Sequence, residues 1–239
     1  AKEGLRVGFW WDGDNVHAPH ILCFDMGTNY GGMGLREEPG GVTLIDLSEE
    51  ARSIWFTAIN DEVQDWLRGS DFKGLINVDV IEVDGRLSLG GWDLGWPKLH
   101  TQVFMSAIKG SFSRFLLGNS SIEFSHRYTV ALPVSIPPWP NNPESKMRGV
   151  SPLNLPIKLN SKLHKHVFFH DVQVDVENKQ LSTAETDGLI GVVHASANNA
   201  VGAIAKTVQI AGLLEVDNSQ YRTDVGVNVT TLIVQLEEQ

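Results

Sequence analysis

Residues 164–171, with the sequence HKHVFFHD, contain three histidines and an aspartate. Such side chains bind zinc and other transition metals. If the stretch is a strand, alternate side chains share a face, and His164 and His166 lie about 6.6 Å apart, near enough for both imidazoles to bind one ion. His170 lies about 13 Å beyond His166 and could join them only if the chain bends. The stretch therefore predicts a site of two histidines or no site.

A third histidine that could complete such a site is His194, in the segment GVVHASAN. Together the two segments resemble part of the metal-binding motifs of the cupins, jelly-roll metalloenzymes with a His-x-His pair and a later Gly-x-x-His-x-x-x-Asn motif. Gly191, His194 and Asn198 match the later motif. The resemblance implies, as an alternative, a metal bound by His164, His166 and His194. The prediction that we favour has no metal and no cofactor, with the histidines half-buried near a strand end.

The composition limits the class of protein. The chain has 239 residues, of which 42% are hydrophobic and 20% charged, and no apolar run reaches the roughly 18 residues of a membrane-spanning helix. The formal net charge of -10 argues against a protein whose main task is to bind phosphate backbones, so we expect only weak or local contact with RNA. Cys23 is the only cysteine, which excludes an intrachain disulfide.

Motifs for nucleophilic or phosphate-binding chemistry do not emerge from the sequence. There is no G-x-S-x-G elbow, and no P-loop or G-x-G-x-x-G follows a predicted strand. The GGMG at residues 31–34 precedes LREEPGG, which does not begin a helix. We therefore expect a protein that is not an enzyme, with the cupin-type metalloenzyme as the alternative.

Hydrophobic periodicity predicts one helix and many strands. Residues 1–40 are rich in Gly, Asp and Asn, and we expect them to be irregular around a short strand at 20–26. Apolar residues at helical spacing predict an amphipathic helix over about 47–68. Beyond it the period becomes two, and Asp84-Gly85 is the signature of a two-residue hairpin. The other strand candidates are residues 75–83, 86–89, 101–108, 121–136, 154–159, 165–176, 188–196, 205–216 and 225–236.

This many short strands, joined by long loops, predicts an all-β protein. We expect a jelly-roll β-sandwich of about eight core strands, formed by a single domain over residues 1–239. The Pro-rich residues 133–156 are expected to include a long surface loop.

The pattern as a whole resembles a capsid protein of the picorna-like positive-strand RNA viruses. The resemblance depends on the all-β run from 75 to 236, the Pro-rich loop, the small-residue segment ASANNAVGAIAK, and the ends Ala1 and Gln239, which suit cleavage from a polyprotein. It implies a structural subunit that is made in the host cytoplasm and assembles with sister subunits into an icosahedral virion around an RNA genome. A plant virus with a multi-protein coat would fit. No membrane partner is expected.

Aromatic and histidine side chains are the candidate contacts of such a subunit. Trp10 and Trp11 would serve as interface anchors, because tryptophan is enriched at binding hot spots, with burial in the core as the equal alternative. His164 and His166 are expected to reach the same kind of contact at the end of the sandwich.

A carbohydrate-binding β-sandwich is a further alternative. Such modules present aromatic rings to sugars, and the segment GGWDLGWPK offers Trp92 and Trp96 at a suitable spacing.

Overall fold

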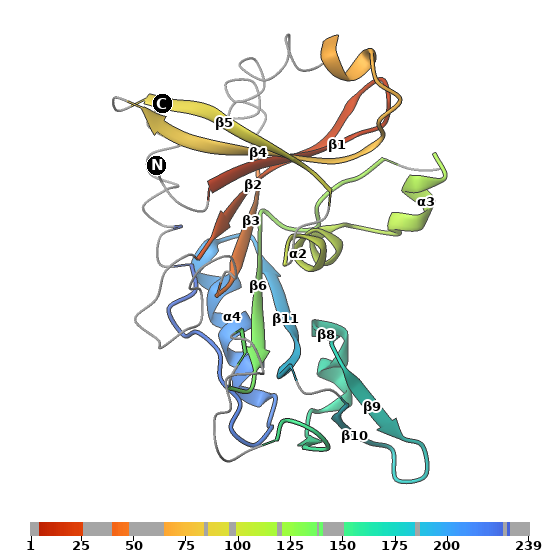
Figure 1. Cartoon of the computed structure of the whole chain (residues 1–239), viewed down its shortest axis with the longest axis vertical. Coiled ribbons are helices and arrows are strands. Elements are labelled where there is room, and N and C mark those ends of the chain that lie inside the picture. The colour runs from red at the N-terminus through yellow and green to blue at the C-terminus, as the bar shows by residue number, and fades with distance from the viewer. Residues whose placement is uncertain are drawn as a thin grey trace.

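The structure, a computed structural model, describes residues 5–25, 40–47, 65–83, 86–95, 99–118, 121–137, 139–140, 151–184, 187–226 and 229. These residues form one large sheet and one small sheet, with helices on both faces of the large one (Figure 1). The ends Ala1 and Gln239 lie outside the described residues.

The large sheet has eight strands, all antiparallel to their neighbours, in the order β5-β4-β1-β2-β3-β6-β11-β8. Figure 1 shows β4 and β5 at one end of the sheet and β8 at the other. The strands are β1 Leu5–Trp11, β2 Val16–Phe24, β3 Val42–Asp46, β4 Gly74–Val83, β5 Arg86–Leu94, β6 Tyr128–Ser135, β8 Val167–Phe169 and β11 Leu189–Ala197.

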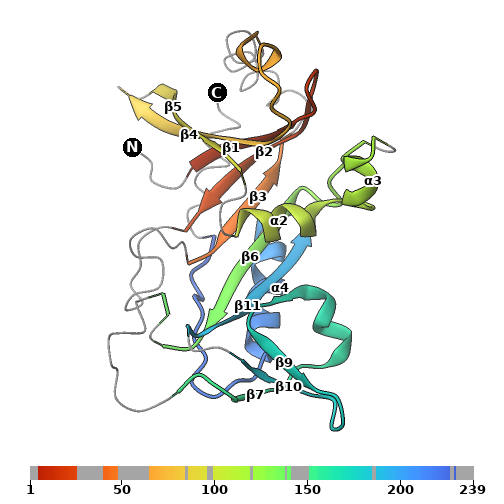
Figure 2. The ribbon, with the colours of Figure 1, turned by 45° about the vertical axis from the view of Figure 1, so that its right-hand side comes forward.

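Helices cover both faces of the sheet near β6 and β11, so these strands are buried on both sides. Helix α2 (His100–Ala107) lies on one face and α4 (Ala200–Leu213) on the other, as Figure 2 shows, while the short α3 (Phe112–Leu116) follows α2. Leu132 of β6 belongs to the core cluster that includes α4, whereas its neighbour Ala131 belongs to the cluster that includes α2. All eight residues of β6 are buried, which explains why its sequence YTVALPVS is continuously apolar or small.

The hairpin predicted at Asp84-Gly85 is confirmed by the strand pairing on either side of it. Strands β4 and β5 pair with Val83 opposite Arg86, which leaves two residues for the connection. The pairing then continues to Ile76 opposite Leu94, with one irregularity between Val78 and Val80. Asp84 and Gly85 themselves lie outside the described residues.

The predicted jelly-roll β-sandwich is wrong. Successive period-two segments pair edge to edge into one sheet, and helices rather than a second sheet bury its faces. Periodicity shows that a strand has an apolar face, but it does not show which kind of element covers that face. Residues 1–40 are also more regular than predicted, since β1 and β2 lie within them.

Two of the predicted strands are helices. Residues 101–108 fall largely in α2, and residues 205–216 overlap the second half of α4. Asn199 caps α4, accepting a hydrogen bond from the backbone N–H of Gly202 at 2.7 Å, and marks a helix start that the periodicity missed. Most of the helix predicted over 47–68 lies outside the described residues, although 65–68 are helical.

The small sheet contains β7 (Pro156–Ile157), β10 (Gln180–Thr183) and β9 (Val172–Asp175), in that order. The strand predicted over 165–176 is interrupted: it begins in the 3-10 helix η1 (Ser161–His166), continues as β8, and turns at Asp171, whose φ of 46° lies in the left-handed region. Val174 and Val176 beyond the turn are 57% and 83% exposed, so they are not core residues. The turn separates β8 in the large sheet from β9 in the small one.

None of the helices that the structure describes is long and apolar enough to cross a membrane.

Candidate functional site

Charged side chains gather on one face of the sheet where β1, β4 and β5 run side by side. Arg6 on β1 is paired with Asp79 on β4, with 2.8 Å between Nε and Oδ1. Its Nη1 atom lies 3.6 Å from Oδ2 of Asp93 on β5. The two carboxylates are about half exposed, so this ion-pair cluster is accessible to a ligand in solvent.

A row of polar residues continues from this cluster across the sheet. Asn77 lies opposite Asp93 on β5 and opposite Gly8 on β1, and Gly8 lies opposite His20 on β2. Because directly paired residues share a face, the side chains of Asp93, Asn77 and His20 lie on the same side. Asn77 is 1% exposed, and its Nδ2 donates to the Gly95 carbonyl, while its Oδ1 has no hydrogen-bond partner among the described residues.

We use the name polar band for the residues that share this face of the sheet or contact those that do. They are Arg6, His20, Asn77, Asp79, Asp93 and His100.

The two histidines of the polar band form a buried, neutral pair. His20 Nδ1 lies 2.7 Å from the carbonyl oxygen of Ala18, so this nitrogen must donate and Nε2 must accept. His100 at the start of α2 therefore donates from its Nε2 to His20 Nε2 across 3.0 Å. Burial lowers the pKa of His20 to about 4. Burial also lowers the pKa of His100, and the nearby His20 and Arg6 act in the same direction.

Gly8 makes room for this histidine pair. A Cβ atom at position 8 would lie 2.4 Å from Nε2 of His20, closer than real Cβ contacts. The His20 ring is enclosed by Phe104 and Phe124, with ring centroids 5.3 and 5.6 Å away, so it has little room to move. Any side chain at position 8 would displace the ring from the hydrogen bond that links it to His100.

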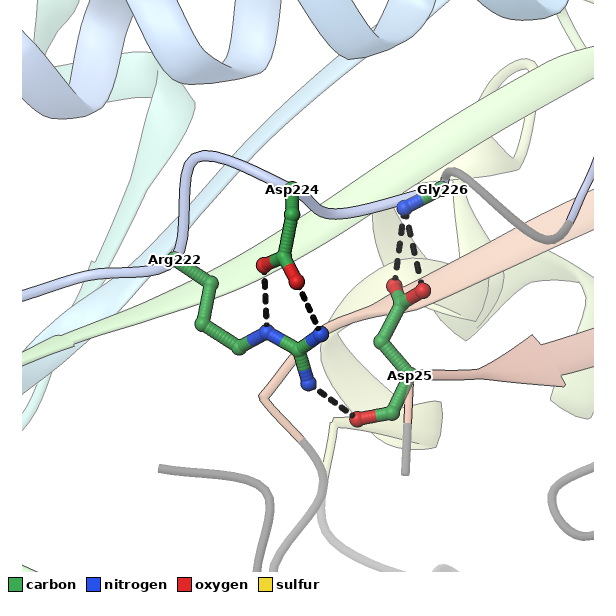
Figure 3. Close-up of polar contacts among 4 residues, drawn as sticks. All are labelled: Asp25, Arg222, Asp224 and Gly226. Atoms are coloured by element: carbon green, nitrogen blue, oxygen red, sulfur yellow. Dashed lines mark hydrogen bonds and ion pairs between the residues drawn. The ribbon is translucent and has the colours of Figure 1, made fainter. Parts of the chain in front are cut away.

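A second polar cluster joins the end of β2 to the C-terminal part of the chain (Figure 3). Arg222 binds both carboxylate oxygens of Asp224, from Nε at 2.6 Å and from Nη2 at 2.7 Å. Its Nη1 also donates to the backbone carbonyl of Asp25 at 2.9 Å. The Gly226 N–H donates to the carboxylate of Asp25, 3.0 and 3.1 Å from its two oxygens. Residues about 200 positions apart in the sequence are thereby held together.

The Asp25 carboxyl group is poised to change its protonation near neutral pH. It is 2% exposed, and this burial raises its pKa to about 6. The Gly226 hydrogen bond and the charge of Arg222 oppose the shift, while the charge of Asp224 adds to it. By contrast, the pKa of Asp224 is lowered, chiefly by its hydrogen bonds to Arg222.

The structure separates the histidines predicted to act together. His164 lies in η1, and its ring contacts Phe169 rather than His166, because the 3-10 helix removes the alternation of a strand. His166 instead faces His194 across β8 and β11, with ring centroids 5.7 Å apart. His170 contacts Gln102 of α2, with 3.4 Å between the two Nε2 atoms. Among the described residues, no group of three His, Cys, Asp or Glu is arranged to hold a metal ion.

The predicted aromatic contacts occupy different environments. Trp11 is 0% exposed and belongs to the core, whereas Trp10 is half-buried with edge contacts to Phe112 and Phe115 of α3. Trp92 is 45% exposed and its ring meets that of Trp66. Trp96 lies outside the described residues.

No protein-family model matches the sequence, and no curated protein matches it. Solved structures do match the backbone. Phosphoribosylamine–glycine ligase from Thermotoga maritima superposes with a TM-score of 0.66 at 15% identity, over 92% of this chain and 55% of that one. Urea carboxylase from Kluyveromyces lactis gives a TM-score of 0.52 at 14% identity, over 98% of this chain and 20% of that one.

The fold is similar to that of ATP-grasp domains. The chain spans about half the length of the glycine ligase that it matches.

This likeness overturns the capsid prediction. The two matching structures named above are a ligase and a carboxylase and not coat proteins, so the predicted icosahedral shell, sister subunits, RNA genome and virion location are wrong. The expectation of a non-enzymatic structural protein is also wrong at the level of the fold. The cupin and carbohydrate-binding alternatives fail because both require a jelly roll or sandwich, which the sheet topology excludes for the described residues.

A fold similar to ATP-grasp domains implies a bound nucleotide with its magnesium ion, but the described residues do not form a site for this complex. Magnesium requires several oxygen ligands, yet none of the described acidic residues form a group of three with each other or with His or Cys. Arg222, which could bind phosphate, is buried and held by both carboxylate oxygens of Asp224. The described residues alone therefore do not fit a magnesium–nucleotide complex.

Neither the polar band nor the Asp25 cluster was predicted from the sequence. Asn77 and Asp79 alternate with apolar residues in GLINVDVIEV, and this signal could have marked a polar face on an otherwise buried strand. Nothing in the sequence brings Asp25 to Arg222, because their contact depends on how the segment after α4 packs against the end of β2.

Proposed function

We propose that this chain is part of an ATP-dependent ligase that joins an amine to a carboxylic acid. The observation that carries the proposal is the backbone likeness to phosphoribosylamine–glycine ligase over 92% of the chain. The polar band supports it as a place where a substrate binds, since it combines charge, accessibility and buried histidines with lowered pKa values on one face of the sheet.

The charges of the polar band complement an amino acid. A guanidinium binds a carboxylate through two parallel hydrogen bonds, which Arg6 can offer once it releases the more distant Asp93 at 3.6 Å. Asp79 and Asp93 carry the negative charge that attracts an ammonium group. The buried Oδ1 of Asn77, for which the described residues offer no hydrogen-bond partner, lies on the same face. We therefore propose an amino acid, with glycine as the first to test, as one of the two substrates.

The test is ligase activity of the full chain with ATP, magnesium, an amino acid panel and an amine panel. ADP formation that requires both an amino acid and an amine supports the proposal. Arg6→Gln should raise the KM for the amino acid by roughly 10- to 100-fold, because hydrogen bonds to charged groups contribute about 1.5–3 kcal/mol. The control Arg68→Gln removes an exposed arginine that is paired with Asp65 and is not a member of the polar band, and it should leave KM unchanged.

Amino acid binding is measured separately by calorimetry. Binding that depends on Arg6 without turnover would retain the substrate assignment and reject the ligase activity of this chain. ADP formation that is independent of any amino acid, or equal KM values in the Arg6→Gln and Arg68→Gln variants, would reject the substrate assignment.

A further inference from the structure

His166 and His194 face each other at the edge of the large sheet, far along the strand order from the polar band. Strands β8 and β11 pair with Val167 opposite Val193; His166 ends η1 directly before this position, and His194 follows Val193 on β11. Their ring centroids are 5.7 Å apart, with Phe168 against His194 at 5.0 Å. Two imidazoles bound to one tetrahedral ion place their ring centres about 5 Å apart, given metal–nitrogen distances of about 2 Å. The pair therefore needs only a small side-chain movement to share an ion.

We propose that His166 and His194 form a binding site for a divalent transition metal ion, with water completing the coordination. No third protein ligand of the described residues joins the pair. Imidazole ligands favour copper, nickel and zinc over magnesium and calcium, which prefer oxygen. The site is independent of the proposed ligase function.

The other histidine pair of the chain is less suited to this role. His20 and His100 lie 5.2 Å apart between ring centroids, but both are 0% exposed. The rings of Phe104 and Phe124 enclose His20, and Phe104 also contacts His100, so neither imidazole is exposed to solvent in the described part of the chain. His166 and His194 are only partly buried and can exchange an ion with solvent.

The experiment is calorimetric titration of the full chain with nickel, zinc and copper chlorides at pH 7.5. We compare the wild type with His166→Gln, His194→Gln and the control His164→Gln, which changes a histidine of the same 3-10 helix whose ring faces Phe169. Loss of a residue that only hydrogen-bonds to a metal ligand reduces metal affinity by about 10- to 100-fold, so loss of the ligand itself should reduce it by at least that factor. The affinity should follow the order copper above nickel.

One saturable ion per chain that is retained in His164→Gln and lost in His166→Gln supports the site. No saturable binding in the wild type, or equal losses in His164→Gln and His166→Gln, would overturn it. Because His194 is the more buried of the two, His194→Gln could unfold the chain, and the comparison of His166→Gln with His164→Gln decides the outcome without it.

Discussion

The neutral burial of His20 makes a quantitative prediction about stability and pH. Burial lowers the pKa of His20 from 6.5 to about 4. Below pH 6.5 the imidazole of residue 20 is protonated in the unfolded chain, whereas in the folded chain it stays neutral down to about pH 4. The free energy of unfolding therefore decreases as the pH is lowered through this window. The difference between the two pKa values corresponds to about 3 kcal/mol, of which roughly 2 kcal/mol is lost between pH 7.5 and 5.

The variant that isolates this effect is His20→Gln, which keeps a hydrogen-bonding side chain beside His100 but cannot titrate. We expect the free energy of unfolding of the wild type to fall by about 2 kcal/mol more than that of the variant between pH 7.5 and 5. Urea denaturation at both pH values, followed by tryptophan fluorescence, measures the difference. His100 has a lowered pKa as well, so any change in its own titration would alter this number without altering its sign.

Other groups titrate in the same window and must be compared between the two proteins. Asp25 has the opposite sign, because burial raises its pKa to about 6 and the folded chain therefore gains stability as the pH falls through this value. His194 acts in the same direction as His20. Both contributions are common to the wild type and the variant and cancel in the comparison. Parallel stability curves for the two proteins would refute the assignment of a neutral, buried His20.

Two further substitutions test the packing of the polar clusters. Gly8→Ala places a Cβ atom 2.4 Å from His20 Nε2 and should lower the free energy of unfolding by about 1–3 kcal/mol. The control Gly69→Ala, whose Cβ would have no neighbour closer than 3.5 Å, should not produce such a loss. Equal effects of the two substitutions in urea denaturation would contradict the close contact at position 8. Arg222→Met leaves the partly buried carboxylate of Asp224 without its guanidinium and should lower the free energy of unfolding by about 3 kcal/mol. Arg68→Met, at an exposed ion pair, should change it by about 0–1 kcal/mol. An equally small loss at position 222 would show that the Arg222 cluster does not hold the chain together.

Sequence patterns over a few residues correctly predicted the elements that depend only on neighbouring residues, such as a tight turn or a strand with one apolar face. The hairpin at Asp84-Gly85 was predicted correctly because a two-residue connection fixes the register of the strands that flank it. The period-two pattern in residues 75–83 correctly indicated a strand for the same kind of reason, since alternation depends only on one covered face. The apolar segment at 205–216 was misassigned, because a short apolar run fits a buried helix as well as a strand.

The candidate site was less predictable than the strands. The stretch HKHVFFHD drew attention to His164 and His166 as a pair, but the 3-10 helix η1 turns their rings apart and places His166 opposite His194. Arg6 and Asp79 meet only because β1 pairs with β4, which follows it by more than 60 residues. Such contacts depend on the order of strands in the sheet, which no spacing within the sequence reveals.

By itself, the sequence determined which segments have an apolar face and where the tightest turn lies, because side-chain period and turn chemistry act over a few residues. Only the tertiary structure decided that these faces are covered by α2 and α4 and not by a second sheet, and this single difference separates an ATP-grasp-like fold from a jelly roll. It also decided which polar residues meet. Burial and strand pairing then set the pKa values of His20 and Asp25, because both depend on what surrounds a side chain in space.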